Sequence, residues 1–89
     1  MSKILIIEDD PVNGQVLTDF LGAHGYDTVL ARSGPEGVKR FGEDRPDLAI
    51  IDVLLPEKNG FEVAFEIRQA PNGGDLPLIM MSAVYTDLE

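Results

Sequence analysis

Acidic side chains follow two short apolar runs of this chain, and a serine follows a third. Glu8, Asp9 and Asp10 come directly after ILII, Asp52 comes after LAII, and Ser82 comes after PLIMM. Carboxylates can bind a hard cation such as Mg²⁺ through oxygen, and a carboxylate can also act as a nucleophile toward phosphorus. The chain has no cysteine and one histidine, so a site for a softer metal is not expected.

The apolar runs are predicted to be strands because they are short and rich in β-branched residues. They span residues 4–7, 26–31, 48–51 and 76–81. Strands that are almost continuously apolar are typical of a parallel sheet that is covered on both faces.

The segments between these runs have the apolar spacing of helices. The first helix is predicted to begin after Asp10, its N-cap, and to stop near Gly25. Ser33 and Glu36 have the spacing of a capping box at the start of the second helix. The third opens at Gly60 and ends before PNGG. Strands that alternate with helices predict one α/β domain over residues 1–89.

Aromatic residues on these helices are predicted to belong to the core. Phe20, Phe61 and Phe65 recur at helical spacing with other apolar residues, and nothing in their pattern indicates a cofactor site. We therefore expect their rings to pack between the helices and the sheet.

The carboxyl ends of neighbouring parallel strands meet at one edge of a sheet, where functional groups collect. If the strands at residues 4–7 and 48–51 are neighbours, we expect Glu8, Asp9 and Asp52 to converge. Like charges so close together need a compensating cation, and Mg²⁺ accepts such oxygen ligands. Asp52 ends an apolar run and should lie deepest, which suits a nucleophile. A hydroxyl from Ser82 could hydrogen-bond a transferred phosphoryl group.

Composition narrows the classes of partner and location. The chain has 7 basic and 16 acidic residues, a net charge of −9, and this charge disfavours binding to nucleic acid or to an anionic membrane surface. The apolar runs are far shorter than the roughly 20 residues that a membrane span needs. The start, MSKILII, lacks the pattern of a secretory signal, so a cytoplasmic location fits.

On these residues the chain resembles the receiver domain of two-component response regulators. The matching features are the acidic pair Glu8 and Asp9 after ILII, Asp52 within DVLLPEKNG, and Ser82 after PLIMM. The resemblance implies a flavodoxin-like, doubly wound parallel sheet in the strand order 2-1-3-4, with the family's fifth strand and helix absent from this chain.

The resemblance also implies a role for each matching residue. Asp52 would be the phosphoacceptor and Ser82 the switch hydroxyl. Glu8, Asp9, Asp52 and the backbone carbonyl of Leu54 would hold Mg²⁺. The phosphoryl donor would be a sensor histidine kinase or a histidine phosphotransfer protein. Such a domain is a signalling switch rather than a conventional enzyme.

The chain departs from the family near its end. Receivers carry a lysine at the end of the fifth strand, and neither Lys39 nor Lys58 occupies that position. Residues 86–89 have the pattern of a fourth helix that is cut short at Glu89. We therefore expect a truncated receiver with weakened phosphorylation. Its open edge at residues 76–81 should favour self-association.

Three alternatives remain open at the level of sequence. One is a degenerate or truncated receiver that acts only as an interaction or dimerisation module. Another is a Mg²⁺-dependent phosphotransferase or phosphatase, but such enzymes usually carry a second acid where this chain has Leu54. The third is a flavodoxin-like binding domain, which is disfavoured because EDDPVNG is acidic and lacks a glycine-rich phosphate loop.

Overall fold

Strands and helices alternate along the chain, as predicted. The structure, a computed structural model, describes residues 2–82, so the predicted start of a helix at residues 86–89 lies outside the described residues. The elements within that range are β1 (Lys3–Ile7), α1 (Pro11–Ala23), β2 (Asp27–Ala31), α2 (Gly34–Asp44), β3 (Leu48–Asp52), α3 (Gly60–Gln69) and β4 (Leu78–Met81). The α/β class is therefore confirmed.

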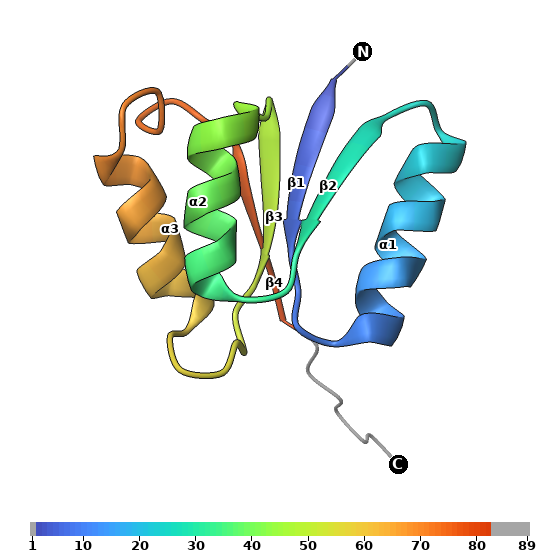
Figure 1. The fold of residues 1–89 in the computed structure, drawn as a ribbon, viewed down its shortest axis with the longest axis horizontal. Coiled ribbons are helices and arrows are strands. Elements are labelled where there is room, and N and C mark those ends of the chain that lie inside the picture. Colours follow the sequence, from blue (N-terminus) through green and yellow to red (C-terminus); the bar gives the residue numbers. More distant parts are fainter. Residues whose placement is uncertain (1, 83–89) are drawn as a thin grey trace.

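The strands form one parallel sheet in the order β2-β1-β3-β4, which is the order that the resemblance implies. In its register Ile7 pairs with Ile51, and Asp52 pairs with Met81. The helix α1 covers one face of the sheet, and α2 and α3 cover the other (Figure 1). This division follows from right-handed crossovers between parallel strands.

Side chains at the helix ends explain where the helices begin and stop. Asp10 caps α1 as predicted, since its carboxylate accepts a hydrogen bond from the backbone N–H two residues on. Ser33 caps α2 through Glu36 N–H, at 3.1 Å, but the Glu36 carboxylate accepts from the N–H of Arg32 instead of Ser33. Only half of the predicted capping box is therefore formed. Gly25 follows α1 with a φ of 90°, a left-handed conformation that favours glycine.

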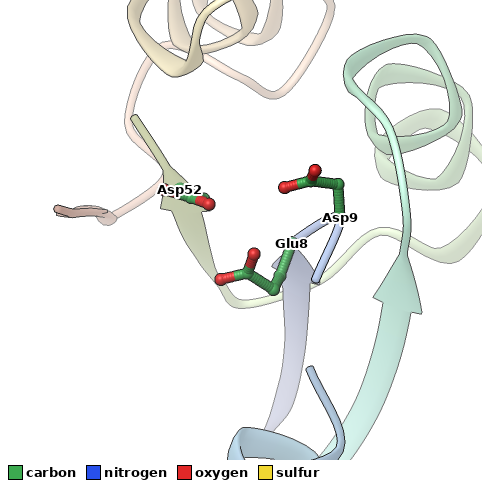
Figure 2. A group of neighbouring side chains, drawn as sticks. All are labelled: Glu8, Asp9 and Asp52. Atoms are coloured by element: carbon green, nitrogen blue, oxygen red, sulfur yellow. The ribbon is translucent and has the colours of Figure 1, made fainter. Parts of the chain in front are cut away.

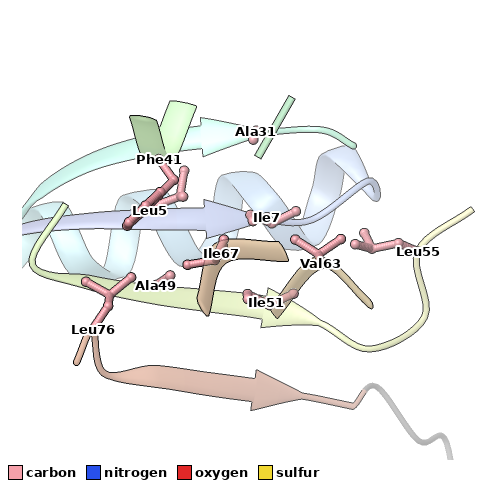
Figure 3. Packing of buried hydrophobic residues seen from close by; sticks show 10 residues of the cluster. All are labelled: Leu5, Ile7, Ala31, Phe41, Ala49, Ile51, Leu55, Val63, Ile67 and Leu76. Carbon is pink, nitrogen blue, oxygen red and sulfur yellow. The ribbon is translucent and has the colours of Figure 1, made fainter. Parts of the chain in front are cut away.

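The larger core cluster lies between the sheet and the helices α2 and α3 (Figure 3). It consists of Leu5, Ile7, Ala31, Phe41, Ala49, Ile51, Leu55, Val63, Ile67 and Leu76. A smaller cluster of Ile4, Ile6 and Ile50 lies on the face that α1 covers. Alternate residues of β1 thus enter opposite clusters, because successive side chains of a strand point to opposite faces.

The prediction that Phe20, Phe61 and Phe65 belong to the core is wrong, because all three are exposed. Phe20, Phe61 and Phe65 are 58%, 61% and 65% exposed. On α3 the buried positions are Val63 and Ile67. Phe61 and Phe65 each lie two residues from Val63, about 160° around the helix, and so they face outward. Phe20 likewise lies outside the part of α1 that packs on the smaller cluster.

The strand β4 begins two residues later than predicted. Pro77 has no N–H to donate, although its carbonyl still accepts from Ala49 at 3.1 Å. The carbonyl of Leu76 accepts a hydrogen bond from the side chain of Arg68. These two residues therefore make other contacts, and regular pairing starts at Leu78.

The strand β4 is one of the two edge strands of the described sheet, the other being β2, and Ile79 of β4 is exposed. Self-association through this edge stays a prediction. Among residues 2–82, no helix has the length and apolar character that crossing a bilayer requires.

Candidate functional site

The pairing of β1 with β3 brings acidic residues from distant parts of the sequence together. Ile7 and Ile51 are partners, so Glu8 and Asp52 come next on adjacent parallel strands. Glu8, Asp9 and Asp52 each offer a carboxylate oxygen, and these oxygens all lie within 4.8 Å of one another. The three side chains are grouped at the carboxyl ends of these strands (Figure 2). The predicted convergence is therefore confirmed.

Two of these carboxylates are buried. Glu8 is 2% exposed and Asp52 is 5% exposed, whereas Asp9 is more accessible. Backbone groups orient both buried acids: Asp10 N–H donates to Glu8 Oε2, and Leu54 N–H donates to Asp52 Oδ1, each at 3.0 Å. The site is thus a group of carboxylates, two of them buried and oriented by backbone N–H groups.

The electrostatics of the site disfavour three negative charges without a cation. Burial raises the pKa of Glu8 to about 7, and Asp52 and Asp9 act in the same direction, while the hydrogen bond from Asp10 opposes them. In the described part of the chain, the salt bridges involve none of these three carboxylates. Hard oxygen ligands that need a positive charge fit Mg²⁺, so the residues present are suited to this ion.

The glycine of DVLLPEKNG, Gly60, is required at this site because there is no room for a side chain. Gly60 donates its N–H to the carbonyl of Val53 at 2.9 Å. A Cβ at residue 60 would collide with the backbone oxygen of Asp52 and approach Val53 Cα to 2.8 Å. Only glycine allows α3 to start so close to the end of β3.

The remaining predicted residues adjoin the carboxylates. Met81 pairs with Asp52 and its carbonyl accepts from Val53 at 2.8 Å, so Ser82 follows at the same end of the sheet, where it is exposed. Leu54 contacts Asp52 through its N–H. The roles of the Ser82 hydroxyl and of the Leu54 carbonyl stay predictions.

The loop between β3 and α3 carries a motif that the sequence analysis missed. Asn59 and Glu62 form a complete capping box, with hydrogen bonds of 3.0 Å in both directions. The spacing N-x-x-E was the signal that could have found it. Lys58 forms an ion pair with Glu66 of α3, so its ammonium group is not paired with the acidic site.

Comparisons with known proteins agree with this geometry. A family model described as the response regulator receiver domain matches residues 4–88. The transcriptional regulatory protein RprY of Bacteroides fragilis is 38% identical over 81 residues, which cover 91% of this chain and 34% of that protein. AfsQ1 of Streptomyces coelicolor, also a transcriptional regulatory protein, is 38% identical over 89 residues, which cover 100% of this chain and 38% of that protein. The chain therefore spans little more than a third of the length of these curated relatives.

Solved receiver structures have the same fold. The N-terminal domain of a response regulator receiver protein from Methanoculleus marisnigri has a TM-score of 0.89 and 28% identity, covering 94% of this chain and 68% of that one. The receiver domain of the sensor histidine kinase PA1611 from Pseudomonas aeruginosa has a TM-score of 0.88 and 32% identity, covering 97% and 70%. That structure holds a magnesium ion coordinated in its active site cleft. With its parallel sheet and its acidic cluster, this chain belongs to the family of two-component response regulator receiver domains.

Proposed function

We propose that Asp52 accepts a phosphoryl group from a phosphohistidine of a sensor histidine kinase or a histidine phosphotransfer protein. The observation that carries this proposal is a buried Asp52 carboxylate whose oxygen lies within 4.8 Å of oxygens from Glu8 and Asp9. Phosphorylation then alters the binding of the chain to a partner.

The proposal includes a Mg²⁺ site formed by Glu8, Asp9, Asp52 and the backbone carbonyl of Leu54. When bound, the ion offsets the negative charge of the carboxylates and of the phosphoryl oxygens. The raised pKa of Glu8 supports this assignment, because a buried carboxyl beside two others takes up a proton when no other positive charge is present.

The transfer step requires a nucleophile held in place. An oxygen of Asp52 attacks phosphorus, the phosphorus–nitrogen bond of the donor breaks, and the imidazole nitrogen keeps the electron pair and later takes a proton. The N–H of Leu54 orients the Asp52 carboxylate through Oδ1. The hydroxyl of Ser82 donates a hydrogen bond to a phosphoryl oxygen once the group is attached.

An interaction-only receiver is the less favoured alternative. A module that served only for association would have no use for two buried carboxylates that lack a salt bridge among residues 2–82, and such groups are unfavourable in the folded state. The chain is therefore assigned to phosphorylation-dependent signalling and not to a conventional enzyme class.

Treatment with acetyl phosphate and Mg²⁺, followed by mass spectrometry of the intact chain, tests the proposal. The wild type should gain one phosphoryl group, and Asp52→Asn should gain none, because an amide is not a nucleophile toward phosphorus. Asp47→Asn is the matched control and should be modified like the wild type, since Asp47 precedes β3 at the opposite end of the sheet. An unmodified wild type would favour the interaction-only alternative.

A further inference from the structure

The helix α3 presents two phenyl rings to solvent near its start. Phe61 and Phe65 are four residues apart, so they are neighbours on the helix surface, and they are 61% and 65% exposed. Large side chains on the surface of a small domain require an explanation when they adjoin one another. These two contribute little to the core, because the buried residues of α3 are Gly60, Val63 and Ile67.

A shallow, open depression lies beside the two rings. It is lined by Lys58, Asn59, Phe61, Glu62, Phe65 and Glu66, which we call the α3 surface. None of these residues belongs to the group of Glu8, Asp9 and Asp52. The α3 surface therefore consists of other residues than the proposed phosphorylation site, although Gly60, next to Asn59 and Phe61, adjoins the backbone of Asp52.

Polar contacts hold the α3 surface in place. The reciprocal hydrogen bonds of Asn59 and Glu62 fix the first turn of the helix. The ion pair of Lys58 with Glu66 joins the preceding loop to the second turn. An exposed apolar pair on such a fixed support loses little conformational freedom when a partner binds, which favours binding.

Charge decides which kind of partner fits. The α3 surface carries Glu62, Glu66 and one lysine, Lys58, and because Lys58 pairs with Glu66 the surface keeps one net negative charge, at Glu62. A second copy would bring the same acidic residues together, on chains that each carry a net charge of −9. Nucleic acid and anionic membranes are disfavoured for the same reason. A basic polypeptide segment is complementary.

We propose that the α3 surface docks a segment of a partner protein that carries apolar side chains next to lysine or arginine. The apolar side chains pack against Phe61 and Phe65, and a basic group pairs with Glu62, which belongs to none of the described salt bridges. The proposal does not depend on phosphorylation of Asp52.

Nuclear magnetic resonance titration of the isotope-labelled chain tests this proposal with two synthetic amphipathic helical peptides, one of leucine and lysine and one of leucine and glutamate. The leucine–lysine peptide should shift the amide signals of α3, and the leucine–glutamate peptide should not. The double variant Phe61→Gln/Phe65→Gln should weaken binding by about tenfold or more. Phe20→Gln, which removes a similarly exposed ring on α1, should change it less than about twofold.

Circular dichroism checks that each variant keeps its helices, and sedimentation measures self-association. Equal binding of the leucine–lysine peptide to the wild type and the double variant would overturn the proposal, as would shifts centred away from α3. Equal binding of both peptides would overturn the charge complementarity. A wild-type dimer that the double variant abolishes would assign the α3 surface to a second copy and would also overturn the proposal.

Discussion

Carboxylates lie at both ends of the sheet, and their surroundings differ. At the amino end of the sheet, where the strands begin, Asp47 is exposed, and its carboxylate accepts a hydrogen bond of 2.8 Å from the N–H of Lys3. Asp44, at the end of α2, lies 3.5 Å from the guanidinium of Arg40. Each of these acids has a donor or a positive charge nearby, and each remains accessible to water in part.

At the carboxyl end of the sheet, where the strands finish, two acids are instead buried next to one another. Glu8 and Asp52 are buried beside each other and beside Asp9, and the described salt bridges include none of them. The acids of the amino end therefore have a local donor or cation, whereas the buried acids of the carboxyl end have other carboxylates as neighbours, which is unfavourable for the folded state when no cation is bound. This difference is the physical reason for placing the function at the carboxyl end.

The largest expected effect on stability concerns Glu8. The pKa of Glu8 is raised from 4.5 to about 7 in the folded chain. At a pH between 4.5 and about 7, Glu8 is therefore mostly protonated in the folded state and mostly ionised in the unfolded state. In the absence of metal, the free energy of unfolding should therefore fall as the pH rises from about 4.5 to 7, by up to about 3 kcal/mol from this group. Glu8→Gln should lack this contribution.

Urea denaturation in the presence of a chelator, repeated across this pH range, measures the effect of Glu8. The difference between the wild type and Glu8→Gln isolates this carboxyl from the other titrating groups. Parallel curves for the two proteins would show that Glu8 titrates normally, and the contrast between the two ends would then lose its main support.

A smaller effect with an informative sign is expected for Asp52→Asn. Above pH 7 and without metal, this change removes a buried negative charge beside Glu8, and the amide oxygen can still accept from Leu54. The variant should be about 1–2 kcal/mol more stable than the wild type. Thermal denaturation in chelator measures this, and a clear loss of stability would mean that the carboxylate is stabilised by the protein itself.

The smallest effect is expected for Asp47→Asn. The side-chain oxygen of asparagine can replace the carboxylate as acceptor for Lys3, and the site is exposed. We expect a loss of about 0.5 kcal/mol or less, opposite in sign to the effect of Asp52→Asn. The same denaturation experiment checks it. A gain in stability as large as that of Asp52→Asn would indicate general charge repulsion across a chain of net charge −9 instead of a special carboxyl end.

Much of this contrast could be predicted from the sequence. The β-branched runs predicted the strands, and the strand order implied by the family resemblance placed the first and third side by side, so the approach of Glu8 to Asp52 followed from both together. Capping was predictable where one side chain decides it, as at Asp10. These features depend on short-range chemistry and on a topology with few alternatives.

Other features depended on tertiary packing, which spacing does not determine. Apolar residues on α3 fall on both sides of the helix, and only contact with the sheet selected Val63 and Ile67 over Phe61 and Phe65. The partner of Lys58 was likewise not predictable, because its pairing with Glu66 requires the loop to fold back on the helix. Sequence reasoning therefore located the acidic site but missed the exposed rings of the α3 surface.

The central claim is that the three carboxylates at the carboxyl end form one cation site. Calorimetric titration with Mg²⁺ above pH 7, where Glu8 is largely ionised, tests it on the wild type, Asp9→Asn and Asp47→Asn. We predict one ion per wild-type chain, about tenfold or more weaker binding for Asp9→Asn, and unchanged binding for Asp47→Asn. The absence of binding to the wild type, or equal losses in the two variants, would contradict the claim.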